Sequence, residues 1–523
     1  MVDVSEFRNY LRNGNLDCKP HQEDGVKWCV TKEIDGVHIN HVRINDVQEC
    51  SDAGVSDGGV SAGGVSAGGA CDSGDNDMVC VRGGIIADEM GLGKTIVMIG
   101  VIISNVLPNT LIVLPRALLE QWETVFINTA GHRPLVYHGS RKYGVTEDTL
   151  RRTPIVITTY GTISGRKLND DETEFTSLLH KVMWNRIIFD EAHHLRNVKT
   201  RAYQGARQLV ADVRWLVTGT PIQNSKSDLY SLCDVLGLPK HHCCSDPDNL
   251  TTIVSELILK RTKEDIGIKL PELNTEVITV RWEHESERRF AKAIHSQLAF
   301  SNVEKHSGVY AHLLDTICDC SLVSLLRARQ MCVYPPLLKR KIKSIIGEDV
   351  EGNVGIYDVL THSSKLNAVA SKILQRKDNA KSKLVFCHYR GEIDALQTKL
   401  ETGGGLHVKT FDGRADTSER ARILTGSCDV LILQIQTGCE GLNLQQFSEV
   451  YFVSPHWNPA VEDQAVARCH RIGQKLDVDV FRFMMESFDQ DNTMVSIDKY
   501  IESVQDDKRG FAKMIDTPND VVD

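Results

Sequence analysis

The chain has 523 residues, of which 41% are hydrophobic and 25% are charged, and its formal net charge is −10. This length allows two to four domains, and the absence of any run of about 18 apolar residues excludes a membrane-spanning helix. Bulk charge gives no support to nucleic-acid binding, so any such binding must come from a local basic surface.

Fifteen cysteines are scattered along the chain without a Cys-x-x-Cys pair. This favours reduced thiols in a nuclear or cytoplasmic protein. The N-terminus does not have the pattern of a secretory signal, so we do not expect secretion. The run His241-His242-Cys243-Cys244 offers metal-ligand types, but adjacent ligands rarely share one tetrahedral ion. We therefore expect an exposed loop there.

Residues 49–77 contain a five-residue glycine-rich repeat with almost no large apolar side chain. Such a segment cannot bury enough surface to offset its ordering entropy. We expect a flexible surface loop inserted into a domain, with no chemistry of its own.

A glycine-rich turn comes after the apolar run 85–87 and ends in Gly-Lys-Thr. Backbone N–H groups of such a turn, at the start of a helix, surround nucleotide phosphates. Lys94 would supply a charge for the β- and γ-phosphates, and the Thr95 hydroxyl would hold magnesium. The strict P-loop pattern is not met, because Gly84 lies too far upstream, so this motif needs support from motifs further along the chain.

Short apolar runs of the buried-strand type then alternate with helical patterns. The first series lies at 111–114, 155–157, 187–189 and 215–217, and the second at 384–386, 408–411, 430–433 and 450–453. Two such series predict an α/β protein with two doubly wound parallel sheets. The segment between them, about 283–360, is expected to be helical and basic in places, and a helix is expected at 496–514.

Two acids come directly after the third predicted strand. Ligands of open α/β sheets sit beyond the carboxyl ends of strands, where a carboxylate can hold the magnesium of a nucleotide and its neighbour can orient or deprotonate water. We assign Asp190 to the metal and Glu191 to the water. An acidic helix N-cap is the alternative for this pair taken alone. The small hydroxyl residues 218–220 after the next strand would sense the γ-phosphate site, or simply form a capped turn.

The second series ends in a basic helical pattern. Gln464, Arg468 and Arg471 would lie on one face of a helix at i, i+4 and i+7. Arginine suits the charge that develops on a transferring phosphoryl group, so a finger from a second lobe would make hydrolysis depend on domain closure. A solvated basic helix face is the other interpretation.

Taken together, these motifs resemble those of Swi/Snf-type ATPases of helicase superfamily 2, from about Leu16 to Ile515. The elements in family order are Pro20-His21-Gln22, DEMGLGKT (88–95), Gln121-Trp122, DEAH (190–193) with Leu195-Arg196-Asn197, Trp215–Asn224, Lys260–Lys263, Gly441–Leu444, Trp457–Ala460 and HRIGQ (470–474). The segment 326–337 resembles the branch containing helicase-like transcription factor, and the compact form is similar to short members from large DNA viruses.

The resemblance implies two RecA-like doubly wound lobes with helical insertions between them. The implied division is 1–282 for the first lobe, 283–360 for a helical linker or protrusion, 361–490 for the second lobe, and 491–523 for a C-terminal helix and acidic tail. Implied ligands are ATP and magnesium, with Thr95 and Asp190 on the metal. Nucleotide contacts are implied for Gln22 at the adenine edge, Asp88, Gly91, Gly93, Lys94, Thr95 and Gln464, and the catalytic set for Lys94, Asp190, Glu191, Arg468 and Arg471.

Family members translocate along double-stranded DNA, usually without separating its strands, so the implied function is ATP-dependent translocation that remodels or displaces DNA-bound protein. DNA-facing positions match Arg116, Thr158, Tyr160, Gly441, Asn443 and Trp457. Two departures, Gln436 for a lysine and Glu440 for an apolar residue, weaken or redirect that contact. Cys318, Cys320 and Cys332 are too few for a RING finger, so ligase activity is not implied.

Nucleosomes and RNA polymerase are the candidate partners besides duplex DNA, and no membrane is expected. The alternatives are a transcription-coupled ATPase acting on RNA polymerase and a catalytically silent scaffold. Intact Lys94, Glu191 and Arg471 argue against the scaffold. The expected location is the nucleus or cytoplasm, or the replication site for a viral member.

Overall fold

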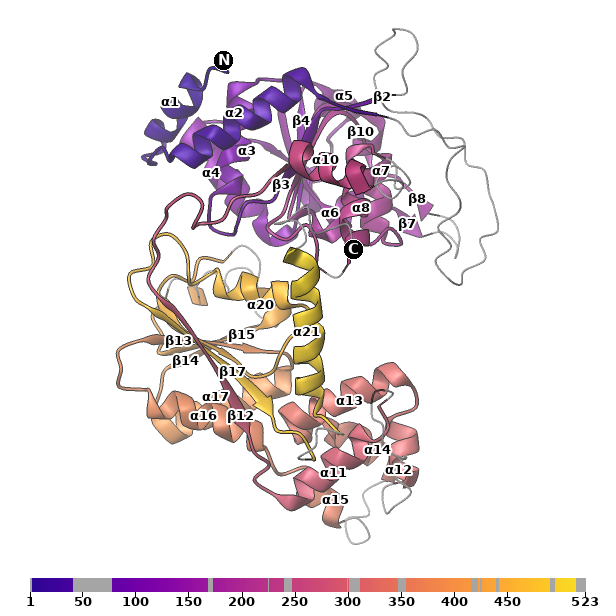
Figure 1. The fold of residues 1–523 in the computed structure, drawn as a ribbon, viewed down its shortest axis with the longest axis vertical. Coiled ribbons are helices and arrows are strands. Elements are labelled where there is room, and N and C mark those ends of the chain that lie inside the picture. Colours follow the sequence, from indigo (N-terminus) through magenta and orange to yellow (C-terminus); the bar gives the residue numbers. More distant parts are fainter. Residues whose placement is uncertain are drawn as a thin grey trace. The chain divides into compact units, whose positions relative to one another are not determined.

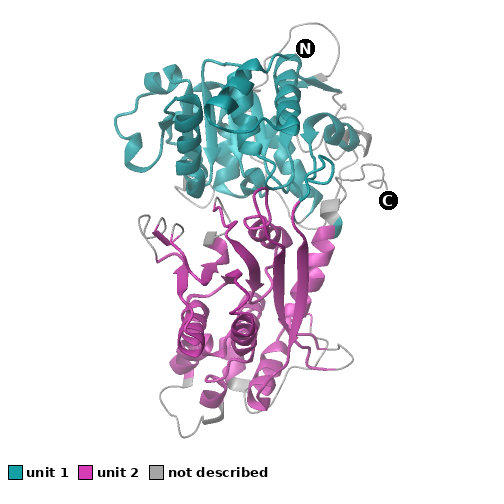
Figure 2. Ribbon diagram, turned by 90° about the vertical axis from the view of Figure 1, so that its left-hand side faces the viewer, with its two compact units in different colours: residues 1–269, 510–523 teal, residues 270–509 magenta. Residues whose placement is uncertain are grey.

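A computed structural model describes residues 2–40, 78–167, 173–223, 225–238, 247–298, 300, 311–346, 354–414, 422–423, 426–438, 442–489 and 494–513. The glycine-rich segment 49–77 and the run 241–244 lie outside the described residues. The chain divides into two compact units, residues 1–269 with 510–523 and residues 270–509 (Figure 2).

The first unit is built on a parallel sheet of seven strands in the order β11-β3-β10-β9-β4-β6-β5. Figure 1 labels three of them, β3, β10 and β4. The strands are β3 (Gly83–Ile86), β4 (Thr110–Leu114), β5 (Leu135–Val136), β6 (Ile155–Thr159), β9 (Met183–Asp190), β10 (Val210–Val217) and β11 (Ile258–Leu259). All four predicted strands of the first series are present, and the P-loop strand joins them. Two antiparallel pairs lie outside this sheet, β1 (Val37–Asn40) with β2 (Met78–Val81) and β7 (Arg166–Lys167) with β8 (Thr173–Glu174).

Helices cover both faces of this sheet because successive strand residues point to opposite sides. One hydrophobic core joins Ile86, Ile112 and Ile188 to the helices α1 (Ser5–Asn13), α2 (Pro20–Asp35), α3 (Lys94–Ser104) and α4 (Leu119–Ala130). The other joins Ile85, Leu111 and Ile187 to α6 (Tyr160–Ile163), α7 (Arg201–Gln208), α8 (Lys226–Leu236) and α10 (Pro247–Leu257). Shorter elements are η2 (Arg116–Leu118), η3 (Gly139–Lys142), α5 (Glu147–Arg152), η4 (Leu178–Lys181) and η5 (Ala192–Leu195).

A buried ion pair fixes α2 to the first sheet. Both side chains of Glu33 and Arg186 are fully buried, with Arg186 Nε donating to Glu33 Oε1 over 2.6 Å. The same carboxylate accepts hydrogen bonds from Trp215 Nε1 (2.7 Å) and Asn105 Nδ2 (2.6 Å). Such a pair is tolerated in a dry core because hydrogen bonds satisfy the charged atoms.

The second unit contains a parallel sheet of six strands in the order β12-β17-β16-β13-β15-β14. These are β12 (Leu273–Val280), β13 (Ser382–Cys387), β14 (Val408–Phe411), β15 (Val430–Gln434), β16 (Phe447–Phe452) and β17 (Val478–Met485). All four predicted strands of the second series are among them. Two parallel sheets flanked by helices confirm the predicted fold class.

The edge strand β12 lies where the first lobe was expected to continue. It pairs with β17 along its whole length, from Leu273 opposite Val478 to Val280 opposite Met485. Residues 270–282 therefore belong to the second unit, and the division lies at 269/270 rather than at 282. Backbone pairing with a strand about 200 residues away decides this, and no local pattern in the sequence carries it.

The helices of the second unit also cover both sheet faces. One core joins β13, β15 and β17 side chains to α11 (Glu285–His295), α12 (Ala311–Ile317), α13 (Ser321–Val333), η6 (Pro335–Leu338), α14 (Lys339–Ile346), α15 (Val354–Val359), α16 (Ser364–Gln375), α17 (Arg390–Gly404) and α21 (Ile497–Lys513). The opposite face packs against α19 (Ile435–Gly438) and α20 (Pro459–Val466). The segment 283–360 is thus a helical insertion that shares the core of the second unit.

No helix among the described residues is long and apolar enough to cross a membrane.

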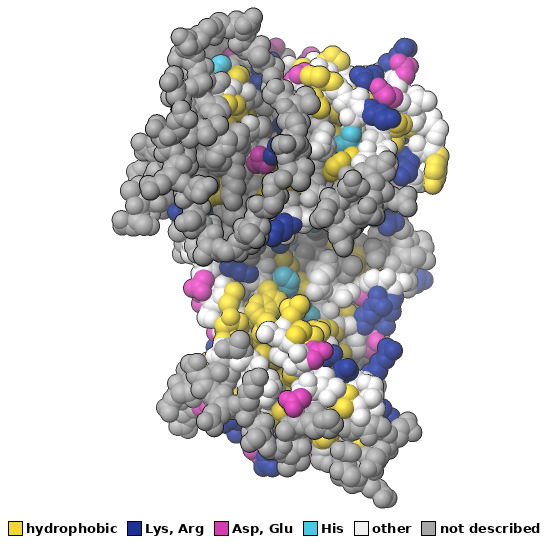
Figure 3. All heavy atoms as spheres, turned by 90° about the vertical axis from the view of Figure 1, so that its right-hand side faces the viewer, with side chains coloured by type: hydrophobic (Ala, Val, Ile, Leu, Met, Phe, Trp, Pro, Cys, Tyr) yellow, Lys and Arg dark blue, Asp and Glu magenta, His cyan; other side chains and the backbone are white. Residues whose placement is uncertain are grey.

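Figure 3 shows basic side chains dispersed over the face in view and hydrophobic side chains gathered on part of the second unit.

Candidate active site

The glycine-rich turn connects β3 to α3, which begins at Lys94. Gly91 and Gly93 have φ values of +92° and +88°, which side chains rarely adopt. A Cβ at Gly93 would lie 2.2 Å from Gln22 Nε2, so glycine is also needed for space. Lys94 Nζ donates to the backbone oxygen of Asp88 over 2.8 Å. The turn has the compact left-handed geometry that a phosphate cradle needs, and Thr95 lies just after it on the first turn of α3.

Gln22 and its neighbour His21 hold this turn from outside. Gln22 Nε2 donates to the backbone oxygen of Leu92 over 3.1 Å, and His21 Nε2 lies 3.0 Å from the same atom. Gln22 is buried. These contacts place Gln22 at the P-loop, while its reading of an adenine edge stays a prediction.

The Asp88 side chain is bound by another residue of the same unit. Its carboxylate accepts two hydrogen bonds from Arg261, at 3.0 and 2.5 Å, and Arg261 also donates to the backbone oxygen of His21 over 2.6 Å. Asp88 is 1% exposed. It therefore braces the turn through Arg261, and a direct contact of its side chain with nucleotide is not supported. Sequence reasoning gave Arg261 no role, although this residue lies in the basic run 260–263 after β11.

Asp190 and Glu191 lie at the carboxyl end of β9, two strands from β3 across β10. Asp190 Oδ2 accepts a hydrogen bond of 2.7 Å from Trp122 Nε1, and Oδ1 accepts one of 3.0 Å from the Glu191 backbone N–H. Glu191 has φ +50°, a conformation costly for a residue with a Cβ and typical of functional sites. Its Oε2 lies 3.4 Å from His193 Nδ1.

Burial, and then the neighbouring Glu191 charge, raise the pKa of Asp190 to about 7. The Trp122 hydrogen bond and the nearby Lys94 charge act in the opposite direction. A bound cation would favour the charged form further. A buried carboxylate whose charge is only partly compensated fits the predicted role of magnesium ligand, and Thr95 as a second ligand stays a prediction.

The loop after β10 reaches the same sheet edge. A Cβ at Gly219 would lie 3.3 Å from Lys94 Nζ, so this loop touches the P-loop lysine. Thr218 Oγ1 accepts from the Thr220 backbone N–H (3.2 Å), and Gln223 Nε2 donates to Thr220 Oγ1 (2.8 Å). Arg196 then donates to Gln223 Oε1. These hydrogen bonds connect Thr218, in the loop that packs against Lys94, to Arg196.

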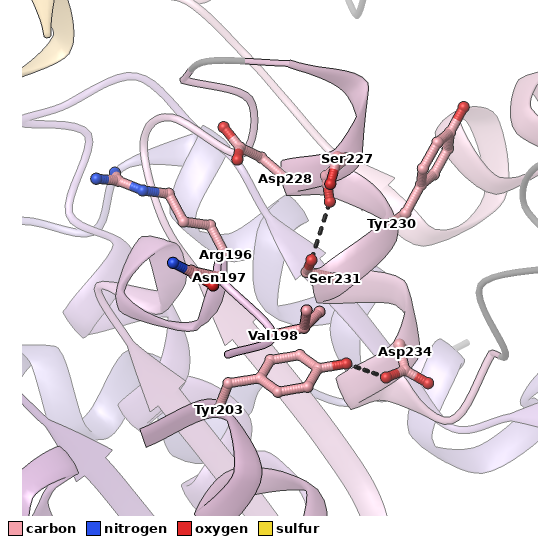
Figure 4. A pocket seen from close by; sticks show the side chains of 9 residues that line it. All are labelled: Arg196, Asn197, Val198, Tyr203, Ser227, Asp228, Tyr230, Ser231 and Asp234. Carbon is pink, nitrogen blue, oxygen red and sulfur yellow. Dashed lines mark hydrogen bonds between the residues drawn. The ribbon is translucent and has the colours of Figure 1, made fainter. Parts of the chain in front are cut away.

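Arg196 lines a cavity of about 480 Å³ between the segment after η5, α7 and α8. Figure 4 shows Tyr203 directed at Asp234 and Ser231 directed at Ser227 within this cavity. Asp228 accepts from the Gln223 backbone N–H over 3.0 Å. That residues 218–220 sense the γ-phosphate site stays a prediction.

Two predicted DNA-facing side chains are not available to DNA. Thr158 is fully buried and donates to the backbone oxygen of Tyr137 over 2.9 Å. Tyr160 is 7% exposed, and its hydroxyl donates to the backbone oxygen of Asp190 over 2.7 Å. The neighbouring Gly161 is exposed. The Tyr160 side chain instead holds the backbone of Asp190.

The other predicted DNA-facing residues differ in exposure. Arg116 is exposed at the carboxyl end of β4, and Asn443 is exposed in the second unit. Trp457 is half-buried, with its ring edge on Tyr500 of α21 and its backbone oxygen accepting from Lys508 over 2.8 Å. Gly441 lies outside the described residues.

The predicted arginine face is not a continuous helix. α20 ends at Val466, and residues 467–474 form turns, so the i, i+4, i+7 relationship of Gln464, Arg468 and Arg471 is wrong. Hydrogen bonds from Leu444 N–H to Arg468 O and from Gln474 N–H to Arg471 O hold the turns instead. Gln464 is buried within α20.

Both arginines nevertheless stay together. Burial, followed by the charge of Arg468, lowers the pKa of Arg471. The Arg471 Nε atom is buried, and no hydrogen-bond acceptor for it is found within the described ranges. A partly buried guanidinium with an unsatisfied Nε–H can accept an anionic partner.

Comparisons with known proteins decide the family. Residues 21–337 match the SNF2-related domain and residues 364–473 the helicase conserved C-terminal domain. The chain belongs to the SNF2-related family. It is therefore a DNA-dependent ATPase of helicase superfamily 2, as the motifs predicted.

Two relatives of this SNF2-related protein differ in how much of their own length it matches. It is 28% identical to a probable global transactivator of Orgyia pseudotsugata multicapsid polyhedrosis virus, over 83% of this chain and 87% of that one. It is 25% identical to mouse helicase-like transcription factor, over 77% of this chain and 50% of that one. The chain thus spans about half of the mouse protein and most of the viral one.

Among solved structures, the Sulfolobus solfataricus SWI2/SNF2 ATPase core in complex with double-stranded DNA is 22% identical, with a TM-score of 0.38 over 97% of this chain and 96% of that one.

Proposed function

We propose that this SNF2-related protein is an ATP-dependent translocase on double-stranded DNA that remodels or displaces DNA-bound protein. The observation that carries the proposal is the meeting of three loops at the carboxyl edge of adjacent strands β3, β10 and β9. They bring together Lys94 and the Asp190–Glu191 pair, with Gly219 beside Lys94, and ATP hydrolysis uses a lysine and two acids of this kind.

Each residue has a distinct proposed task. Lys94 neutralises the β- and γ-phosphates, and the turn at Gly91 and Gly93 offers backbone N–H groups to them. Asp190 and Thr95 would hold magnesium, which supplies charge neutralisation at the phosphates when bound. Glu191, in its strained conformation beside Asp190, orients and deprotonates the attacking water.

Arg468 and Arg471 are proposed as the arginine fingers of the second unit. The buried, unsatisfied Nε of Arg471 supports this, because an arginine finger needs a donor that the resting protein has not consumed. Their approach to Lys94 when the two units close is part of the proposal.

Both units are proposed to bind duplex DNA, and the exposed residues Arg116 and Asn443 are the proposed contacts. The printed name of the viral relative, a probable global transactivator, supports a role in transcription as the second candidate. On either function the protein would act where DNA is transcribed or replicated, in the nucleus or at a viral replication site.

The test is ATP hydrolysis by the purified full chain with no nucleic acid, single strands, duplex DNA, RNA and nucleosomes. We expect duplex DNA to stimulate hydrolysis most and Lys94→Ala to abolish it. Movement is measured separately, as ATP-dependent displacement of the third strand of a DNA triplex. Hydrolysis that is indifferent to duplex DNA would refute the translocase. Preferential co-purification with RNA polymerase would favour the second candidate.

A further inference from the structure

Helix α14 of the helical insertion carries the densest basic run of the chain. Its sequence begins Lys339-Arg340-Lys341 and continues through Ile342 to Lys343. Lys339, Arg340 and Lys343 are exposed, whereas Ile342 is fully buried in the core of the second unit. Because Ile342 packs into the core, the opposite face of the helix is exposed to solvent. We define these three exposed residues as the α14 basic surface.

The charges on this surface are unfavourable for the fold. Residues 339–341 occupy the first turn of α14, where the helix dipole is positive and cations are destabilising. If these residues served only as a solvent-exposed face that stabilises the helix, we would expect acidic residues in this first turn.

Neighbouring acids do not compensate for the charges of this first turn. Within the part of the chain that the structure describes, Lys339, Arg340 and Lys341 form no ion pair. By contrast, the exposed arginines of α5, Arg151 and Arg152, are each paired with an acid one turn away. The first turn of α14 is therefore a local concentration of uncompensated cations on a protein whose formal net charge is −10.

We propose that the α14 basic surface is an additional contact for the phosphate backbone of duplex DNA, separate from the predicted DNA-facing loops at the strand ends. Duplex DNA carries one charge per about 1.7 Å of axis, so three cations on one helical turn of about 6 Å rise meet several phosphates at once. The inference rests on the proposed function, because that function supplies the duplex.

The contact has a specific consequence for a translocating enzyme. Phosphate contacts carry no sequence information and allow a protein to slide. A backbone contact on the helical insertion would raise affinity for DNA without taking part in hydrolysis. It would also compensate for Gln436, where the family's lysine is absent from the strand-end loop.

The experiment measures binding of the full-length protein to a fluorescent duplex as a function of salt, by anisotropy, without ATP. The variant is K339Q/R340Q/K343Q. The control is R133Q/R151Q/R152Q, which removes the same number of charges from exposed arginines of the first unit that pair with acids. Thermal unfolding and basal ATP hydrolysis of both variants are measured in parallel.

We expect the α14 variant to bind the duplex roughly ten-fold more weakly at low salt, and its slope of log K against log salt to fall by about 2 to 3. The control should keep the slope of the wild type. Thermal stability of the α14 variant should be unchanged or higher, because unfavourable charges at a helix N-terminus are removed.

Unchanged affinity and slope in the α14 variant would overturn the inference, as would equal losses in the α14 variant and the control. Binding of poly-glutamate that depends on α14, with DNA binding unaffected, would also overturn it and indicate an acidic protein partner. Failure of the proposed function is distinguishable, because it appears as wild-type hydrolysis that does not respond to duplex DNA.

Discussion

The indole N–H of Trp122 donates a 2.7 Å hydrogen bond to Oδ2 of Asp190. Trp122 is fully buried in α4, and Asp190 ends β9, so the hydrogen bond joins two elements about 70 residues apart. It orients the carboxylate that we assign to magnesium. Trp122 thus supports the proposed metal ligand, although its own side chain cannot bind a metal ion.

Trp122→Phe should impair magnesium use while keeping the aromatic packing with Phe126. Loss of a hydrogen bond to a charged group costs about 1.5–3 kcal/mol, so we expect a roughly ten-fold rise in the magnesium concentration for half-maximal ATP hydrolysis. Trp184→Phe is the matched control, because its buried Nε1 donates only to the Leu179 backbone oxygen. An equal rise in both variants would show that the effect is general packing.

Arg471→Ala should reduce DNA-stimulated hydrolysis by at least about 100-fold, since an arginine finger acts on the transition-state charge. ATP affinity, measured with a fluorescent nucleotide, should change little. Lys475→Ala, at an exposed position just after the same turns, should behave as wild type. Full activity of the Arg471 variant would remove this residue from the proposed mechanism.

Glu33→Ala should strongly destabilise the first unit, because it leaves Arg186 buried without its partner. Breaking one side of a buried pair costs about 3–5 kcal/mol, which urea unfolding would detect as a lower midpoint. If that variant does not fold, Glu33→Gln tests the same point with a smaller loss. Glu147→Ala, which removes an exposed pair with Arg151, should change stability by no more than about 1 kcal/mol.

Acid should destabilise the second unit through His295. Burial lowers the pKa of His295 from 6.5 to about 4, and its ring joins Ala291 O (2.7 Å) to the Ile497 N–H (3.0 Å). The folded protein thus holds this ring neutral while the unfolded chain protonates it. Its contribution to stability is complete above pH 6.5 and is lost as the pH falls towards 4, by about 3 kcal/mol.

The measurement is the free energy of unfolding between pH 7 and 4. His295→Gln should flatten the fall in this window, since it removes the titrating ring but keeps a polar side chain. His362→Gln, at a surface pair with Asp358, is the control. Identical pH profiles for wild type and His295→Gln would contradict the assignment.

Much of this protein was readable from its sequence because the information was local. Runs such as 111–114 and 430–433 are apolar enough to be buried strands in any context, and Gly91 and Gly93 are needed wherever a turn with positive φ meets a phosphate. Each motif is also a short local pattern, and the order of these patterns along the chain identified the family.

Only the tertiary structure decided the rest, because those features depend on which distant segments meet. Sequence patterns assign Asp88 to nucleotide and Thr158 to DNA. In the structure Asp88 accepts a hydrogen bond from Arg261, and Thr158 donates one to the backbone oxygen of Tyr137. The helix expected at Arg468 ends two residues earlier. The strand β12 belongs to the second sheet because hydrogen bonds with β17 satisfy its backbone, a partnership that no window of sequence around it reveals.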